Sequence, residues 1–239
     1  MSITKGQRPV ALIIALELEA QALIRHLTPS AVSSPQLSIW EGEVEGKPVV
    51  LVITGVGKVA AALATQFVCD TFKPRSVITV GIAGATESDS SPGRLIIATG
   101  ALQYDMDARP FTAARGTLPS LGLATIPADP TLSKQLRRAA ESVVDRPVQS
   151  GVVLTGDQVV TSREIRDRIL IDFPDGACFD METAAIAQVA RQNGVPWAAL
   201  RMTSDAADET FDLEEVVGFG ITTAADLFDQ VARAVLKEL

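Results

Sequence analysis

The sequence predicts an α/β protein with a mixed, largely parallel central sheet that is covered by helices on both sides. Three observations lead to this fold class. Several short segments are apolar at every position, which is typical of strands buried on both faces. These segments alternate with longer ones in which apolar residues recur at helical spacing. Aromatic residues make up only 5% of the 239 residues, so we expect an aliphatic core.

Strands and helices are expected to alternate along the amino-terminal half. Continuous runs of Val, Ile and Leu predict the strands, and the helix after the second strand is rich in alanine. In chain order we expect a strand within 8–16, a helix over 17–27, a strand over 48–55, a helix over 58–72, and strands over 75–84 and 94–100.

The carboxy-terminal half continues the alternation. Expected helices cover 131–144, 162–173, 181–194 and 222–239, and expected strands cover 150–156 and 196–204. Gly194 and Pro196 supply a stop for the third of these helices. The chain has no internal repeat and no low-complexity linker, so we expect a single domain over residues 1–239.

Composition excludes several classes of partner. The formal net charge of −8 argues against nucleic acid or an anionic membrane surface, since both need a cationic face. The amino-terminus lacks the apolar stretch of a secretory signal, and no apolar run is long enough to span a bilayer. Cys69 and Cys178 lie in apolar runs without metal-ligand spacing, as buried reduced thiols do. We expect a soluble cytoplasmic protein.

The sequence gives little support for a metal site, a bound cofactor or a nucleophilic Ser or Cys. His26 is the one histidine, clustered His and Cys ligands are absent, and no G-x-S-x-G motif occurs. The glycines of "TGVGKVAAALA" (54–64) match a dinucleotide-binding fingerprint, but no acidic residue follows the next expected strand before Glu87. We therefore expect no metal and no cofactor. The glycines then allow either a close approach of backbone to a ligand or tight strand–helix packing.

Acidic residues follow the ends of the expected strands. In open α/β sheets ligands bind beyond the carboxyl ends of strands, so acids at several ends should converge on one crevice. An acid-lined crevice suits the positive charge of an oxocarbenium-like sugar, with one acid protonating the leaving group and another activating water. The residues are Glu17, Glu19, Asp157, Asp180, Glu182, Asp205 and Asp208, together with Arg201 inside an apolar strand.

These segments resemble the 5′-methylthioadenosine/S-adenosylhomocysteine nucleosidases of the nucleoside phosphorylase/hydrolase superfamily. The resemblance covers most of the chain, and "FDMETAAIAQVA" and "RMTSDAAD" are its most specific motifs. The others are "ALIIALELEAQAL", "TGVGKVAAALA", "VGIAGA", "YDMDARPF" and "GDQVVTS". It implies a three-layer nucleoside phosphorylase-like fold, a small purine nucleoside as partner, and a homodimer.

The resemblance also implies roles for matching residues. Glu19 corresponds to the base that activates water, with Arg201 helping to orient that water. Asp205 corresponds to the acid that protonates purine N7. Glu182 corresponds to the residue that binds the ribose hydroxyls, and Met181 packs on the sugar.

At the two ends of the nucleoside, the resemblance implies further contacts. The backbone of Val160 would read the adenine edge, and Phe211 would border the 5′-thio pocket. Ala108 and Phe111, in the neighbouring subunit of a dimer, would close that pocket.

Three residues depart from the family pattern. Ile82 stands where the family has Ser or Thr, so a hydroxyl near the water or phosphate position is lost. Val159 stands where an aromatic residue stacks on the purine, so base packing would be aliphatic. Asp180 replaces a longer Glu. These changes bear on the preferred substrate more than on the chemistry.

The expected reaction is hydrolysis of the N-glycosidic bond of adenine 5′-thioribonucleosides. Glu19 disfavours phosphate as the nucleophile, since two like charges ~4 Å apart repel by about 4 kcal/mol at an effective dielectric constant of ~20. Two alternatives stay open. One is a related nucleosidase or phosphorylase for another base or 5′ group, such as aminofutalosine, and the other is a nucleoside-binding protein whose catalysis is weakened.

Overall fold

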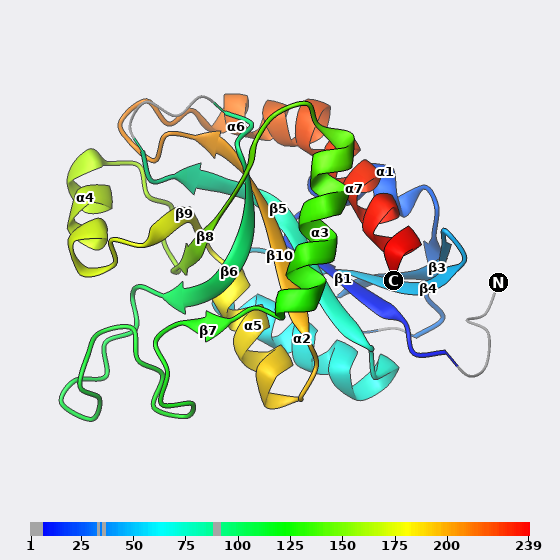
Figure 1. Ribbon diagram of the computed structural model, residues 1–239, viewed down its shortest axis with the longest axis horizontal. Coiled ribbons are helices and arrows are strands. Elements are labelled where there is room, and N and C mark those ends of the chain that lie inside the picture. Colours follow the sequence, from blue (N-terminus) through cyan, green and yellow to red (C-terminus); the bar gives the residue numbers. More distant parts are fainter. Residues whose placement is uncertain (1–6, 33, 35–36, 88–91) are drawn as a thin grey trace.

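A mixed sheet with helices on both faces forms the centre of the molecule, as the computed structural model shows for residues 7–32, 34, 37–87 and 92–239 (Figure 1). The expected fold class is confirmed. The first six residues, which belong to the segment expected to lack a secretory signal, lie outside the described residues, as do parts of two loops rich in Ser and Pro. Within the described part, no helix is long and apolar enough to cross a membrane.

Ten strands make up the sheet within the described residues. They are β1 (Val10–Ile14), β2 (Thr28–Pro29), β3 (Ser38–Val44), β4 (Lys47–Ile53), β5 (Ser76–Ala85), β6 (Leu95–Gln103), β7 (Ile126–Pro127), β8 (Val148–Thr155), β9 (Gly176–Asp180) and β10 (Trp197–Asp205). The helices are α1 (Glu17–Ile24), α2 (Lys58–Phe72), α3 (Pro130–Val143), α4 (Arg163–Asp172), α5 (Thr183–Gln192), α6 (Leu213–Phe219) and α7 (Ala225–Glu238), with a π-helical turn η1 (Gly220–Ala224) before α7.

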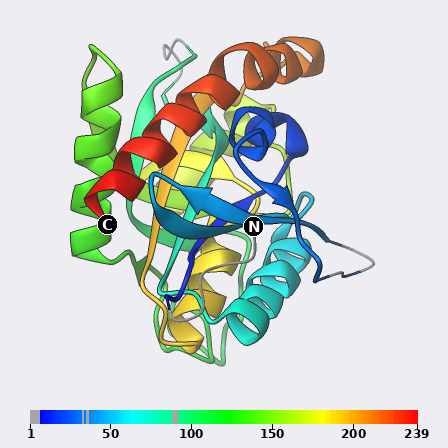
Figure 2. The same cartoon turned by 90° about the vertical axis from the view of Figure 1, so that its right-hand side faces the viewer.

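Two aliphatic cores lie on the two faces of the sheet. Helices α1, α3 and α7 bury their apolar sides against one face, and α2 and α5 cover the other (Figures 1 and 2). Phe228 of α7 is one of the largest fully buried side chains, and most of the remaining core is Val, Leu, Ile and Ala. The low aromatic content predicted this composition.

Strand pairing brings the ends of distant segments together. Strands β1, β4, β5 and β10 run parallel to one another, and β6, β8 and β9 form a second parallel group of opposite direction. The last residues of β5 leave β10 and pair antiparallel with β9, through Gly84 with Phe179 and Ala85 with Cys178. The path β10–β6–β8–β9–β5 therefore closes on itself.

Several elements were not predicted from the sequence. The strands β2, β3, β7 and β9 and the helix α6 were not assigned, and the helix expected over 181–194 begins only at Thr183. Strand β3 lies near the sheet edge, and only two of its seven residues are buried, so it lacks the continuous apolar run that identified the other strands. Strand β9 is only five residues long and carries the polar Asp180 at its end. Met181 and Glu182 consequently lie in the turn between β9 and α5.

Candidate active site

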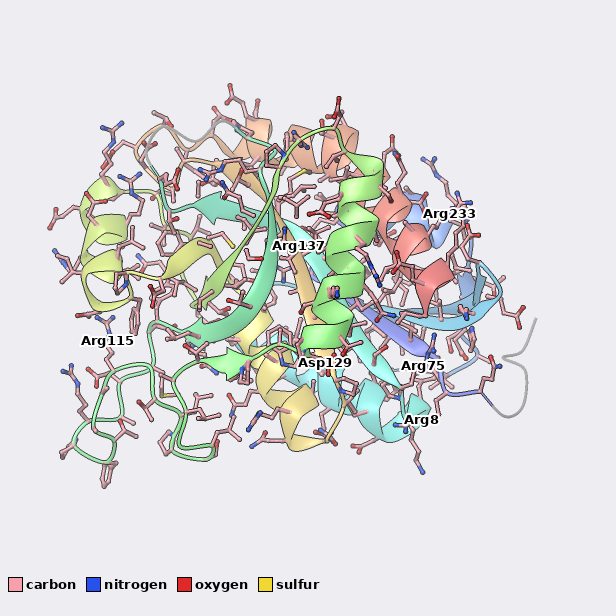
Figure 3. The ribbon with its side chains drawn as sticks, viewed as in Figure 1. Arg8, Arg75, Arg115, Asp129, Arg137 and Arg233 are labelled. Carbon is pink, nitrogen blue, oxygen red and sulfur yellow. The ribbon has the colours of Figure 1, made fainter. Side chains whose placement is uncertain are left out.

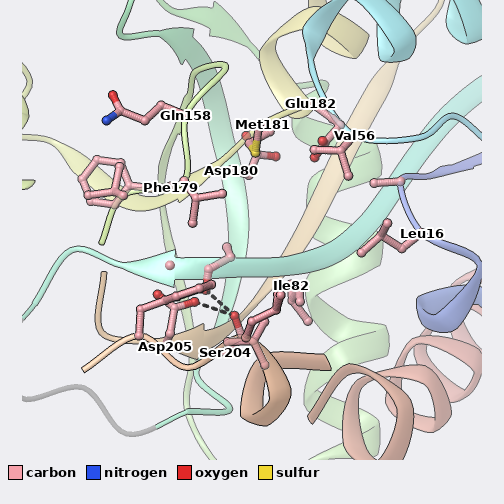
Figure 4. Close-up of a pocket in the computed structure, with 18 of the residues that line it drawn as sticks. Leu16, Val56, Ile82, Gln158, Phe179, Asp180, Met181, Glu182, Ser204 and Asp205 are labelled. Carbon is pink, nitrogen blue, oxygen red and sulfur yellow. Dashed lines mark hydrogen bonds between the residues drawn. The ribbon is translucent and has the colours of Figure 1, made fainter. Parts of the chain in front are cut away.

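A cavity of about 240 Å³ opens where β1, β5 and β10 end and the turn after β9 meets them (Figure 4). Four carboxylate side chains from three separate parts of the chain lie on an otherwise largely apolar lining. The lining residues are Ala15, Leu16, Glu19, Val56, Ile82, Ala83, Gly84, Gln158, Val159, Val160, Phe179, Asp180, Met181, Glu182, Ser204, Asp205, Phe211, Leu213 and Val216.

Glu19 reaches the cavity from the first turn of α1. The backbone N–H of Ile82 donates to Oε1 at 2.8 Å, and that of Leu16 donates to Oε2 at 3.0 Å. Burial raises the pKa of Glu19 above its ordinary value of 4.5, although these hydrogen bonds and the charge of Arg201 oppose the shift. The result is a buried carboxyl group of fixed orientation and increased basicity.

Gly81 allows Glu19 and Arg201 to come close to each other. A Cβ at this position would lie 3.0 Å from Nη1 of Arg201 and 3.1 Å from Oε1 of Glu19. A larger residue would therefore push the guanidinium and the carboxylate out of place.

Asp180 forms a buried anchor in the wall of the cavity. Its carboxylate accepts a hydrogen bond from Arg201 Nε at 2.9 Å and one from Thr155 Oγ1 at 2.5 Å. The backbone N–H of Thr183 donates at 3.0 Å, and the Thr183 hydroxyl donates to the same oxygen. Because both carboxylate oxygens already have protein donors, Asp180 holds Arg201 and the start of α5 in place.

Glu182 follows Asp180 by two residues and points into the cavity. The backbone N–H of Gly57 donates to its Oε1 at 2.8 Å. Gly57 has φ of 101°, in the left-handed region that favours glycine. Burial first, and then the nearby charge of Asp180, raise the pKa of Glu182 to about 8.

Asp205 lies at the opposite side of the cavity, at the end of β10. Its Oδ2 accepts a hydrogen bond from the Ser204 hydroxyl at 2.7 Å (Figure 4). Its Oδ1 accepts one from the backbone N–H of Ala207 at 2.9 Å. Ala207 is fully buried and has φ of 50°, a left-handed conformation that is uncommon without glycine. The turn after β10 thus fixes the direction of the Asp205 carboxylate.

The remaining walls are apolar. Val160 is buried, whereas the Val159 side chain is 51% exposed at the rim. Phe179 of β9 is also buried and lines the cavity, so an aromatic ring is available although Val159 is aliphatic. Leu213 and Val216 of α6 complete the wall beside Phe211.

Most of the residues predicted for the site line this one cavity. They are Glu19, Ile82, Val159, Val160, Asp180, Met181, Glu182, Asp205 and Phe211. Arg201 lies behind the wall, 2% exposed and paired with Asp180. Ala108 and Phe111 do not line it either, since they lie in the long connection between β6 and β7, where Phe111 is 92% exposed.

Three other acids of the predicted crevice lie elsewhere. Glu17 and Asp157 are exposed and do not line the cavity. Asp208 is buried but binds the Thr210 backbone N–H and hydroxyl and pairs with Arg163. Their position after a strand was therefore not sufficient to place them in the cavity. Within the described residues, no three His, Cys, Asp or Glu side chains are grouped as metal ligands would be.

Some lining residues were not predicted. Leu16 and Ser204 are the last residues of two segments that the sequence predicts as strands. They could have been found by the rule that ligands bind near the carboxyl ends of strands, which we call the strand-end rule. Phe179 and Leu213 had no such signal, because β9 and α6 were not assigned.

Comparison with known proteins identifies the family. The model of the Phosphorylase superfamily matches residues 9–237. The 5′-methylthioadenosine/S-adenosylhomocysteine nucleosidase of Actinobacillus succinogenes is 38% identical over 170 residues, covering 71% of this chain and 73% of that protein. The Staphylococcus carnosus protein of the same name is 30% identical and covers 96% of this chain and 100% of its own length.

A solved structure agrees with this assignment. The crystal structure of the Neisseria meningitidis 5′-methylthioadenosine/S-adenosylhomocysteine nucleosidase in complex with methylthio-immucillin-A matches with a TM-score of 0.90 and 33% identity, over 98% of this chain and 100% of the other. The chain belongs to the phosphorylase superfamily and, within it, to the 5′-methylthioadenosine/S-adenosylhomocysteine nucleosidase family.

Proposed function

We propose that this protein hydrolyses the N-glycosidic bond of adenine 5′-thioribonucleosides, 5′-methylthioadenosine or S-adenosylhomocysteine, and releases adenine. The observation that carries the proposal is that the carboxylates of Glu19, Glu182 and Asp205 line one cavity although they come from distant parts of the chain. The names of the relatives and the nucleoside-analogue complex of the Neisseria meningitidis enzyme support it.

In this proposal Glu19 takes a proton from the attacking water. Two backbone N–H groups hold its carboxylate at one end of the cavity, so the base cannot turn away from the sugar. Its raised pKa makes it a stronger base than an ordinary glutamate. Arg201 lies behind the cavity wall, where it is paired with Asp180, and it acts on Glu19 through its charge.

Glu182 and Asp205 act on the sugar and the base. The backbone N–H of Gly57 donates a hydrogen bond to Oε1 of Glu182. The other carboxylate oxygen remains available to accept hydrogen bonds from the ribose hydroxyls. Asp205, on the opposite side, donates a proton to the leaving purine. As the bond breaks, the positive charge that develops on the ribose is stabilised by the surrounding carboxylates. Val160 and Phe179 supply the surfaces that hold the base.

The lining favours water over phosphate as nucleophile. None of the described lining residues is Lys or Arg, and Ile82 presents a hydrocarbon side chain beside Glu19. A phosphate dianion needs hydrogen-bond donors and positive charge at close range. Phosphorolysis therefore has no binding site of suitable chemistry at this end of the cavity.

The proposal includes one domain over residues 1–239, a homodimer and a cytoplasmic location. The single sheet that carries both helix layers supports the single domain. Exposed apolar side chains next to the cavity support the dimer: Val56 is 52%, Val59 79% and Leu63 49% exposed at and along the start of α2. The partner subunit would bring Phe111 to the 5′ end of the cavity.

A panel of nucleosides tests the proposed function. The purified protein is incubated with methylthioadenosine, S-adenosylhomocysteine, adenosine, inosine and aminofutalosine, with and without phosphate, and the products are identified by mass spectrometry. We expect adenine and free thioribose from the first two, independent of phosphate. A sugar 1-phosphate, or cleavage of only the other nucleosides, would contradict the proposal.

A further inference from the structure

The cavity is bordered by two loops whose relative position depends on three charged residues. One loop carries Gly57, whose N–H holds Glu182, and the other carries Gln158, Val159 and Val160, which line the base side. The three residues are Lys58, Asp105 and Asp157, which we call the Lys58 bridge.

The Lys58 bridge is built from four contacts. The Lys58 ammonium donates to Asp105 Oδ1 at 2.6 Å and lies 3.7 Å from Asp157 Oδ2. The backbone N–H of Lys58 donates to Asp157 Oδ1 at 2.8 Å, and the backbone N–H of Asp157 donates to Asp105 Oδ2 at 3.0 Å. Each residue therefore contacts both of the others, and together they join the segments that follow β4, β6 and β8.

The position of the bridge relates it to the reaction. Gly57 and Lys58 are consecutive, and their two N–H groups bind Glu182 on one side and Asp157 on the other. Asp157 is directly followed by Gln158, whose carbonyl also accepts a hydrogen bond from the Tyr104 hydroxyl at 3.3 Å. The Lys58 bridge thus connects the segment that holds the Glu182 carboxylate to the loop that lines the base side of the cavity.

Charge balance explains why Lys58 controls this distance. Its ammonium lies between two carboxylates, and its side chain is 17% exposed, against 32% for Asp105 and 49% for Asp157. Without the cation, Asp105 and Asp157 would repel each other across a short gap, and the base-side loop would move outward. Catalysis is sensitive to such displacement, since a shift of ~1 Å can reduce rates about 100-fold.

We infer that Lys58 is a positioning residue of the reaction, which sets the separation between the ribose-binding and adenine-binding sides of the cavity through Asp105 and Asp157. This inference rests on the proposed function. Lys58 acts through other residues and does not line the cavity itself.

The test compares Lys58→Met with Asp105→Ala and the double variant. Lys58→Met keeps the backbone N–H and most of the length of the side chain but removes the charge. We expect kcat/KM for methylthioadenosine to fall about tenfold in each single variant. The double variant should fall no further, because both changes remove the same connection. Lys58→Arg should recover part of the activity.

A matched control separates positioning from general stability. Arg168 forms an exposed ion pair with Glu164 on α4, so Arg168→Met also removes one surface pair. Lys58→Met and Arg168→Met should show similar thermal midpoints, but only Lys58→Met should lose activity. Unchanged kcat/KM in Lys58→Met, additive losses in the double variant, or an equal loss in Arg168→Met would overturn the inference.

Calorimetry keeps this test distinct from that of the proposed function. If the wild-type protein cleaves no nucleoside, the proposed function fails, and intact methylthioadenosine then serves as the ligand. In that case Lys58→Met should bind it about tenfold more weakly than the wild-type protein if the bridge positions the two sides. Equal affinity would reject the positioning role.

Discussion

Neighbouring donors give the four carboxylates of the cavity different functions. Asp180 accepts four hydrogen bonds and anchors Arg201 and α5. Glu19 and Glu182 accept theirs from backbone N–H groups in buried surroundings that raise their pKa. Asp205 is oriented by Ser204 and the turn at Ala207. The hydroxyls of Thr155 and Thr183 both reach the short Asp180 side chain.

Asp205→Asn tests the general acid. The amide cannot donate a proton of the required acidity, so kcat for methylthioadenosine should fall by ~10²–10⁴-fold, as is typical when a general acid is lost. Binding measured by calorimetry should persist, because the cavity keeps its shape. A rate near that of the wild-type protein would show that another group protonates the base.

Glu182→Gln tests the raised pKa of Glu182 in the free protein. Its ordinary pKa is 4.5, and the folded protein raises it to about 8. Between these values the folded state binds a proton that the unfolded state releases. The stability from this group is therefore fully present below pH 4.5 and is lost as pH rises through about 8.

Glutamine does not titrate, so the variant should gain thermal stability relative to the wild-type protein as pH increases from about 5 to 9. Thermal unfolding of both proteins across this range measures the difference. A difference that stays constant with pH would contradict the assigned shift.

At the scale of elements, the sequence predicted the buried strands and the long helices well. Runs such as "ALIIAL" and "VVLVI" identify β1 and β4 because both faces of these strands are covered. Strand β9 could not be predicted, because five residues that end in an aspartate carry no periodic signal. Its direction also explains the site, since Asp180 and Glu182 reach the cavity from a strand antiparallel to β5.

The strand-end rule was therefore correct for only part of the site. Glu19 follows β1 and Asp205 ends β10, two strands that run parallel, and this relation could be predicted. Asp157 also follows a strand, but its side chain turns to Lys58 instead of the cavity. Whether such an acid enters the cavity depends on the three-dimensional path of its loop. The spacing of residues in the sequence does not reveal that path.

Asp129→Ala tests the amino-terminal cap of α3, a helix that does not line the cavity. Asp129 precedes α3, at the lower end of the helix in Figure 3, and its Oδ1 accepts a hydrogen bond from the Leu132 N–H at 2.8 Å. Loss of this cap should lower the free energy of unfolding by about 1 kcal/mol, measured by denaturant titration. Activity should not change, and Asp129→Asn should retain most of the stability. Unaltered stability in the alanine variant would show that the cap contributes nothing.

At the scale of the whole molecule, closure of the path β10–β6–β8–β9–β5 brings the two parallel groups of strands to one cavity. The fold class was predictable because buried strands and amphipathic helices alternate along the chain. The closure of the strand path could not be predicted, because it depends on the residue at which β5 changes its pairing partner from β10 to β9.

Leu63→Glu tests the proposed dimer. A glutamate is compatible with the exposed helix α2 but would place charges against each other across a symmetric apolar contact. Light scattering should show a monomer at concentrations where the wild-type protein is dimeric, and kcat/KM should fall because the partner's loop is lost. Ile171→Glu, on the remote helix α4 at an 80% exposed residue, is the control and should stay dimeric. A dimeric Leu63→Glu variant would place the interface elsewhere.

The most direct test of the account identifies the nucleophile. Methylthioadenosine is cleaved in water enriched in oxygen-18 and containing phosphate, and the sugar product is analysed at once by mass spectrometry, against a product control that measures exchange with solvent. Activation of water by Glu19 predicts adenine and a thioribose that carries one heavy oxygen at its anomeric carbon, at a rate that Glu19→Gln abolishes. A sugar 1-phosphate, or full activity of Glu19→Gln, would contradict it.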